Sequence, residues 1–252
     1  MRSHKLWSIF LLVPVLLYGS IFNKDGTATS EGVWSLNINP AGVVESKYSR
    51  ALASYSLLYP SLPGDGISSF SFGYNYPWRV WGVGITGEMF QAGDVYQQLE
   101  LGISGAHYII APLFKPRSLS LGLNFKLLSV SYPEEGFFEF DQDDPLFSKY
   151  GSSKLDFTFD CGLKFRLSSL RMGVNLQNIK KPNLSLSGVS EGQLPMGIRG
   201  GVSYAFSDVA SVELDIQKKM AEEYPLTFST LLKYFLFNNQ ISVRAVTEFS
   251  TE

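Results

Sequence analysis

The residue types best suited to catalysis are scarce in this chain. His107 is the one histidine after the first twenty residues, and Cys161 is the single cysteine. A general base needs an oriented partner within hydrogen-bond reach, and the segment GAHYII around His107 supplies none. The one G-x-S-x-G match, GVSEG at residues 188–192, lies in a predicted loop rather than at the strand-to-helix turn that a nucleophile needs. Cys161 lies among alternating apolar residues as a small hydrophobic side chain. We therefore expect a non-enzymatic protein that uses no cofactor.

One acidic run could in principle bind a metal ion. Asp141, Asp143 and Asp144 in FDQDDP offer the carboxylate oxygens that Ca²⁺ prefers. The run lacks the glycine and the terminal glutamate of the EF-hand spacing. A solvated loop is the favoured interpretation, so we expect no metal site.

The stretch LDFTFDCGLKFRL, residues 155–167, alternates apolar and polar residues at every step. Successive side chains of a strand point to opposite faces, so this segment has one wholly apolar face and one polar face. The alternation lasts longer than the roughly 9–11 residues that a tilted strand needs to cross a bilayer. Its length favours a membrane strand.

The same alternation recurs almost from end to end and yields eleven candidate strands, from about 48–59 to 240–250. If the first strand runs outward, the long connections fall at its far end and the short ones at its starting end. This asymmetry is typical of outer-membrane barrels. We expect an all-β, antiparallel up-and-down transmembrane β-barrel, with a soluble secreted β-sandwich or barrel as the alternative.

In such a barrel the apolar face meets lipid and the polar face lines the lumen. The polar positions carry both signs of charge, which suits a self-paired, plugged interior better than a pore whose rings share one sign. A charge at Leu163 should then block insertion, whereas Lys164→Ser should be tolerated. The expected lipid-facing residues are Phe157, Phe159, Leu163 and Phe165, and the expected lumen-facing charges are Asp156, Asp160, Lys164, Arg166, Arg171 and Arg199.

An odd number of strands leaves a free edge, whereas bacterial single-chain barrels normally have an even number. The segment GVWSLN could pair as a further strand, one strand could be misread, or the chain could be a fragment lacking C-terminal strands. We favour the fragment.

The first residues, MRSHKLWSIFLLVPVLLYGS, have a basic start, a short apolar run and small residues at Gly19 and Ser20. This layout is that of a secretory signal. We expect a signal peptide at 1–20, an N-terminal segment at 21–46, and an outer-membrane barrel at 47–252 in a bacterial outer membrane.

The N-terminal segment contains Asn39, Pro40, Ala41 and Gly42 in the sequence WSLNINPAGV. Asn39 can cap a tight turn, Pro40 fixes φ at the next position, and Gly42 permits a left-handed exit. The tetrapeptide predicts a compact turn or a single helical turn.

This turn stands after a signal and immediately before amphipathic strands. Together with LDFTFDCGLKFRLSSLRMGVNLQNIKKP and LPMGIRGGVSYAF, it resembles the PorV/PorQ family of FadL-like outer-membrane β-barrel proteins. The resemblance implies a barrel with more strands than the eleven found here and an N-terminal turn tucked into the lumen. It also implies a role in type IX secretion, as a carrier of exported cargo, or transport of hydrophobic molecules.

The expected partners are outer-membrane lipid or lipopolysaccharide, together with secretion-system proteins or a hydrophobic solute. Docking of secretion proteins would use the long loops 132–153 and 180–195. A formal net charge of -2, without a basic cluster interleaved with aromatic residues, gives no case for nucleic acid.

Overall fold

The computed structural model describes residues 26–58, 66–112, 117–133, 149–188, 192–207, 209–221, 224–236 and 241–250. The expected signal segment at 1–20 and the acidic run at Asp141, Asp143 and Asp144 lie outside these residues. Within the described part of the chain, no helix has both the length and the hydrophobicity needed to span a bilayer.

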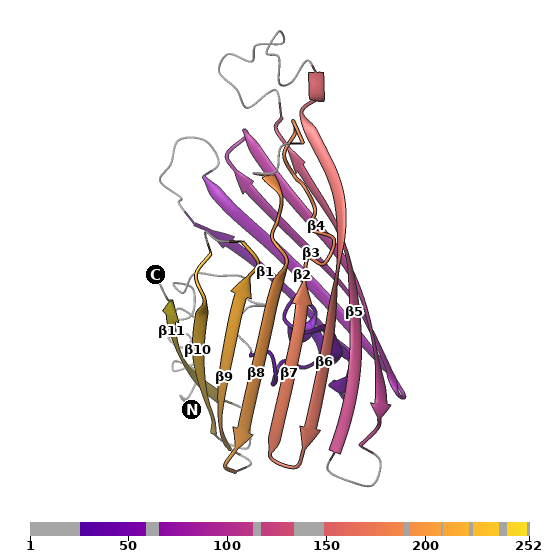
Figure 1. The fold of residues 1–252 in the computed structure, drawn as a ribbon, viewed down its shortest axis with the longest axis vertical. Helices are drawn as coiled ribbons and strands as arrows, with labels where there is room; N and C mark the ends of the chain where they lie inside the picture. The colour runs from indigo at the N-terminus through magenta and orange to yellow at the C-terminus, as the bar shows by residue number, and fades with distance from the viewer. Residues whose placement is uncertain are drawn as a thin grey trace, which may run out of the picture.

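Eleven strands form a single antiparallel sheet in which each strand pairs with the next along the chain. This meander confirms the predicted all-β, up-and-down fold (Figure 1). Two short 3-10 helices precede it, η3 (Gly32–Ser35) and η4 (Pro40–Glu45). The strands are β1 (Arg50–Leu57), β2 (Ile67–Trp78), β3 (Trp81–Ala92), β4 (Tyr96–Ile110), β5 (Arg117–Ser131), β6 (Ser153–Leu167), β7 (Leu170–Gln177), β8 (Gly197–Ala205), β9 (Ala210–Lys219), β10 (Thr227–Leu236) and β11 (Ile241–Ser250).

Short turns and long connections lie at opposite ends of the sheet, as predicted. The pairs Trp78–Trp81 and Leu167–Leu170 each close a two-residue turn. Arg79 and Ser168 have φ of 55° and 52° there, and the primed turns that suit hairpins require positive φ at their first central residue. At the other end of the sheet, Ser131 at the end of β5 pairs with Ser153 at the start of β6, so the long connection between these strands begins and ends there (Figure 1).

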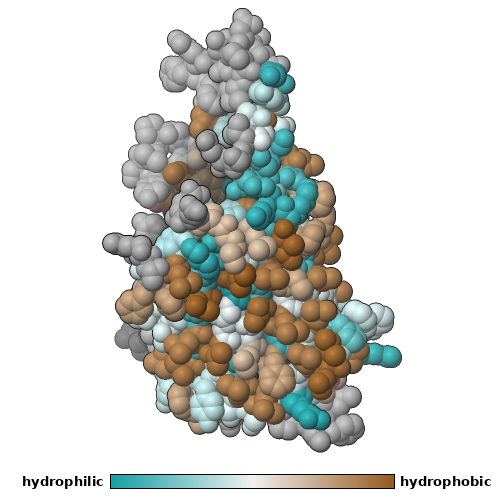
Figure 2. Space-filling view, in the orientation of Figure 1, coloured by the Kyte–Doolittle hydropathy of each residue, from teal (hydrophilic) through white to brown (hydrophobic). Residues whose placement is uncertain are grey.

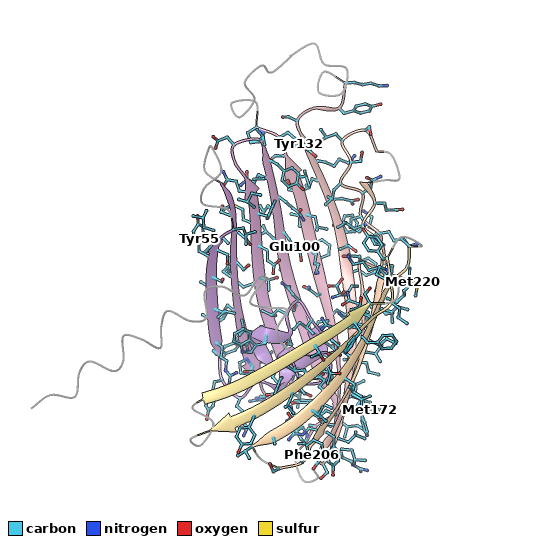
Figure 3. The ribbon with its side chains drawn as sticks, turned by 90° about the vertical axis from the view of Figure 1, so that its left-hand side faces the viewer. Tyr55, Glu100, Tyr132, Met172, Phe206 and Met220 are labelled. Carbon is cyan, nitrogen blue, oxygen red and sulfur yellow. The ribbon has the colours of Figure 1, made fainter. Side chains whose placement is uncertain are left out.

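The sheet curls around its own interior, so that the last strands cross opposite the first ones (Figure 3). Among the described residues, no backbone pairing joins β1 to β11, and these two strands form the edges. The segment GVWSLN does not pair in as a further strand, because Gly32–Ser35 forms η3.

The distribution of side chains is the reverse of that in a soluble domain. Large apolar side chains are exposed on the outer face, such as Ile103 and Leu163, whereas Asn124, Thr158 and Asp160 are buried on the inner face. Apolar residues form a broad belt over the lower part of the molecule (Figure 2). This arrangement is that of a transmembrane barrel strand, with lipid outside and a polar lumen inside.

The buried apolar core lies inside the curled sheet and comes mainly from the N-terminal segment. Val33, Leu36, Val43 and Val44 cluster there with Ala106 of β4. We call residues 26–46, which contain η3 and η4, the plug. It occupies the space that would otherwise be an open lumen (Figure 1).

Candidate functional site

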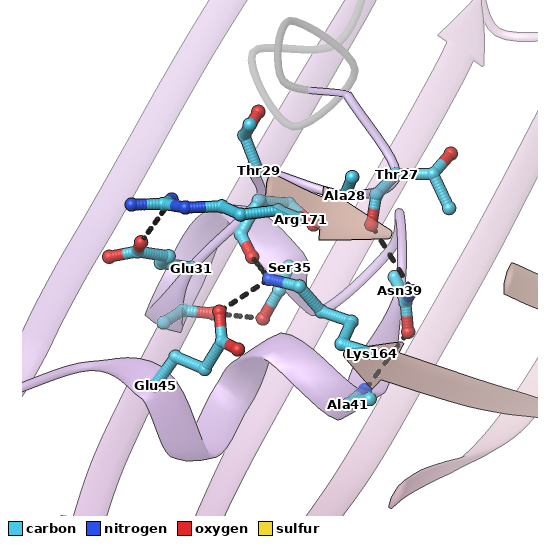
Figure 4. Close-up of polar contacts among 12 residues, drawn as sticks. Thr27, Ala28, Thr29, Glu31, Ser35, Asn39, Ala41, Glu45, Lys164 and Arg171 are labelled. Carbon is cyan, nitrogen blue, oxygen red and sulfur yellow. Dashed lines mark hydrogen bonds and ion pairs between the residues drawn. The ribbon is translucent and has the colours of Figure 1, made fainter. Parts of the chain in front are cut away.

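The turn at Asn39 fastens the plug to the sheet. The Asn39 side chain accepts a hydrogen bond from the backbone N–H of Ala41 at 3.2 Å and so caps η4. Its amide nitrogen donates to backbone oxygens of Thr27 at 3.2 Å, Leu163 of β6 at 3.3 Å and Val174 of β7 at 3.4 Å. One fully buried amide therefore joins two parts of the plug to two strands (Figure 4).

Glycines of the sheet give the plug room for close backbone approach. A Cβ added at Gly82 of β3 would lie 2.7 Å from the backbone of Val44. A Cβ at Gly122 of β5 would meet the Pro40 backbone, and one at Gly162 of β6 would meet Asn39. These glycines interrupt the polar face because only hydrogen fits under the turn.

A buried ion pair holds the end of η4. The Lys164 ammonium lies 2.6 Å from a Glu45 carboxylate oxygen and also donates to the Ser30 carbonyl at 2.5 Å. Lys164 is 2% exposed, so its charge depends on these two partners. Arg171 pairs with Glu31 at 2.9 Å in a more exposed position (Figure 4).

The first residues of the plug are held by acidic side chains of β9. Glu213 accepts hydrogen bonds from the N–H of Ala28 at 2.7 Å and of Thr29 at 3.2 Å, and from the Thr29 hydroxyl. Asp215 accepts from the N–H of Thr27 at 3.1 Å and 3.2 Å. The plug is therefore held by β9 as well as by β6, which lies three strands away along the sheet.

Amide side chains of two strands, β5 and β7, bind the middle of the plug through its backbone. Asn124 of β5 donates to the Leu36 carbonyl at 3.3 Å, and Asn175 of β7 donates to the Ile38 carbonyl at 2.7 Å. Gln177 donates to the Asn37 carbonyl at 3.2 Å. Such bonds satisfy the backbone groups of irregular chain inside a membrane protein.

The residues expected to face the lumen divide into four groups. Lys164 and Arg171 bind the plug, whereas Asp160 pairs with Lys126 at 3.0 Å and Arg199 approaches Asp215 only to 3.8 Å. Asp156 lies toward the outer end and pairs with Lys180 at 2.6 Å. Arg166 lies on the inner-facing side of β6, but its position near the turn leaves it exposed.

The residues expected to face lipid lie on the outer face of β6. Phe157, Phe159 and Leu163 are exposed, whereas Phe165 is half-buried.

The sequence did not single out Glu31 and Glu45 as partners of the lumen charges. Both glutamates lie in the segment that contains the Asn39 turn. Because that segment was expected to enter the lumen, its acidic residues could have been predicted to pair with basic residues of the inner face.

Above the plug lies a cavity of about 390 Å³. Only charged residues and amides line it, drawn from the plug and from six strands. They are Asn37, Glu88, Glu100, Lys126, Gln177, Arg199, Gln217 and Lys219. Within the described residues, no group of three or more histidine, cysteine, aspartate or glutamate side chains is placed to hold a metal ion.

A curled antiparallel sheet with an apolar outer face and an occupied polar interior defines a protein of the outer-membrane β-barrel class. Residues 35–251 match the family described as "Type IX secretion system membrane protein PorP/SprF". The match spans most of the sequence, so the chain belongs to the PorP/SprF family. Comparison with the sequences of curated proteins gives no match.

Solved structures show the same fold at low sequence identity. The "CymD monoaromatic hydrocarbon channel" has a TM-score of 0.57 and 14% identity, covering 90% of this chain and 81% of its own. The "TodX deltaS2S3 mutant monoaromatic hydrocarbon channel" has a TM-score of 0.57 and 12% identity, covering 93% and 83%. The Ralstonia pickettii toluene transporter TbuX has a TM-score of 0.55 and 11% identity, covering 94% and 87%. At these identities the likeness shows the fold alone.

These findings support the expected outer-membrane protein of type IX secretion with a FadL-like fold. They do not confirm the PorV/PorQ family, because the family that matches is PorP/SprF. The residues that carried the resemblance, such as the Asn-Pro-Ala-Gly turn, are short and of common types. Such motifs indicate the fold better than the individual family.

Proposed function

We propose that this chain is a non-enzymatic outer-membrane protein that acts in protein secretion by docking a protein partner, as a cargo-shuttling protein of the PorV/PorQ type would. The observation that carries the proposal is the occupied interior. The plug is held by Asn39, Lys164 and Glu213, and the cavity above it is polar throughout. An interior filled in this way blocks passage through the sheet and so favours action through the outer loops.

One outer loop is held in a defined shape that suits docking. Asp156 at the outer end of β6 accepts hydrogen bonds from the Lys180 ammonium at 2.6 Å and from the Asn183 N–H at 2.7 Å. An isolated antiparallel bridge joins Asn183 to Gln193 across this loop. A preorganised loop loses less conformational entropy when a partner binds.

Transport of a hydrophobic solute is the second candidate. A group of aromatic rings near the outer end favours it. The ring centroid of Tyr96 lies 6.1 Å from that of Phe90 and 5.5 Å from that of Tyr132, and Figure 3 shows Tyr132 near the outer end of the sheet. Below these rings, a solute would meet a cavity of charges and amides whose desolvation opposes apolar binding. Uptake of radiolabelled toluene by cells that carry the chain, above that of cells lacking it, would favour this candidate.

Site-specific photocrosslinking in cells tests the docking proposal. Tyr150, in the outer connection before β6, is 41% exposed, and p-azidophenylalanine replaces it with little change of shape. We expect it to yield adducts that mass spectrometry identifies as secreted proteins or secretion-system components. The matched control is the same label at Phe206, which is exposed at the short turn between β8 and β9.

Equal protein adducts from both positions, or lipid adducts alone at Tyr150, would contradict docking at the outer loops. Loss of the secreted proteins from the medium when the chain is deleted gives an independent readout of the same role.

A further inference from the structure

The cavity above the plug has one acidic wall. Glu88 of β3 and Glu100 of β4 are direct register partners, an arrangement of like charges that is unfavourable by itself. Glu88 accepts a hydrogen bond from the Asn37 amide at 2.6 Å. Lys126 lies 3.1 Å from Glu100 and 3.0 Å from Asp160, so two carboxylates share its one ammonium. Glu100 and Asp160 together carry one more charge than Lys126 neutralises, so this wall favours a further cation.

The other wall of the cavity is basic. Arg199 of β8 and Lys219 at the end of β9 both line it. The nearest carboxylate to Arg199 is Asp215 at 3.8 Å, and both Asp215 oxygens already accept from the Thr27 N–H. Among the described residues, the buried Nε of Arg199 has no hydrogen-bond partner. The guanidinium therefore has donors available for an anion.

Because one wall is acidic and the other is basic, the cavity suits a ligand that carries both a positive and a negative charge. We propose that this cavity binds a zwitterionic solute of amino-acid or short-peptide size. Its carboxylate lies at Arg199, which can donate two parallel hydrogen bonds, and its ammonium lies at Glu100, which shares the Lys126 ammonium with Asp160. The volume of about 390 Å³ falls within the roughly 300–1,000 Å³ of small-molecule sites.

The placement of the cavity indicates binding rather than passage. Lys219 stands where β9 ends at an outer connection, and Glu100 lies at mid-height on the inner face (Figure 3). Asn37 of the plug forms part of the opposite boundary. A solute that enters from the outer side stops at the plug. This inference is independent of the docking proposal, whose crosslinking test it leaves unchanged.

Calorimetric titration of the detergent-solubilised protein with alanyl-alanine tests the proposal. We expect saturable binding that weakens by at least roughly tenfold when the amine is acetylated, and equally when the carboxylate is amidated, because each loses one charge-assisted contact. No binding at millimolar dipeptide, or equal binding of the blocked peptides, would overturn it. These arms use the unaltered protein.

A pair of variants assigns the carboxylate contact. Arg199→Gln should weaken binding of alanyl-alanine by at least roughly tenfold and leave binding of its amidated form unchanged, because only the carboxylate contact is lost. Arg166→Gln removes an exposed arginine of β6 outside the cavity and should bind like the unaltered protein. Equal losses in the two variants would contradict the role of Arg199.

Discussion

Replacing Lys164 with methionine is expected to destabilise the protein by about 3–5 kcal/mol, because removing one partner of a buried ion pair leaves the other charge uncompensated. Lys164 is 2% exposed and its partner Glu45 is 9% exposed. The Ser30 carbonyl would also lose its donor. The midpoint of urea unfolding in detergent micelles measures the effect.

The matched control is Arg171→Met. Arg171 also pairs with a plug carboxylate, Glu31, but the two side chains are 26% and 37% exposed. Exposed pairs contribute about 0–1 kcal/mol, so this variant should unfold near the midpoint of the unaltered protein. Equal destabilisation by both replacements would contradict the distinction between buried and exposed plug contacts. Sequence alternation alone suggests that Lys164→Ser is tolerated, and the burial of this ammonium against Glu45 and Ser30 now predicts the opposite.

Replacing Leu163 with arginine is expected to cost about 2–4 kcal/mol of stability in a bilayer, the cost of a cation near the midplane on the lipid face of a barrel. Leu163 lies on the exposed outer face of β6. It stands four positions above the turn-proximal end of that strand at Leu167, which places it well within a band about 25 Å tall. The fraction of protein inserted into lipid vesicles, followed by the heat-dependent shift in gel mobility, reports the effect.

Leu155→Arg supplies the control on the same strand and the same face. Leu155 lies near the outer end of β6, where a charge costs about 0–1 kcal/mol. Insertion of this variant should resemble that of the unaltered protein. If Leu155→Arg were as damaging as Leu163→Arg, the assignment of depth along β6 would be wrong.

The strands could be predicted from sequence because each carries its own alternation. In β6, odd-numbered positions such as Phe157 and Leu163 face outward, and even-numbered positions such as Asp160 and Lys164 face inward. This assignment follows from the strand's own sequence and does not require knowing which residues pack against it. The eleven-strand count and the opposite placement of short and long connections followed from the same local signals and are confirmed.

The contacts inside the sheet could not be predicted in this way. The pairing of Lys164 with Glu45 joins residues 119 positions apart, and it depends on how far the sheet curls. The segment GVWSLN was a candidate for a further strand, yet Gly32–Ser35 forms a 3-10 helix that packs as core. The alternation places Arg166 on the inner face, but it does not show that β6 ends one residue later, which leaves Arg166 exposed.

Swelling of proteoliposomes in an isotonic sugar solution tests the occupied interior most directly. The unaltered protein, with residues 26–46 held by β6, β7 and β9, should give the swelling rate of protein-free liposomes. A rate like that of an open porin at the same protein content would mean that the plug does not fill the interior, and it would contradict the account.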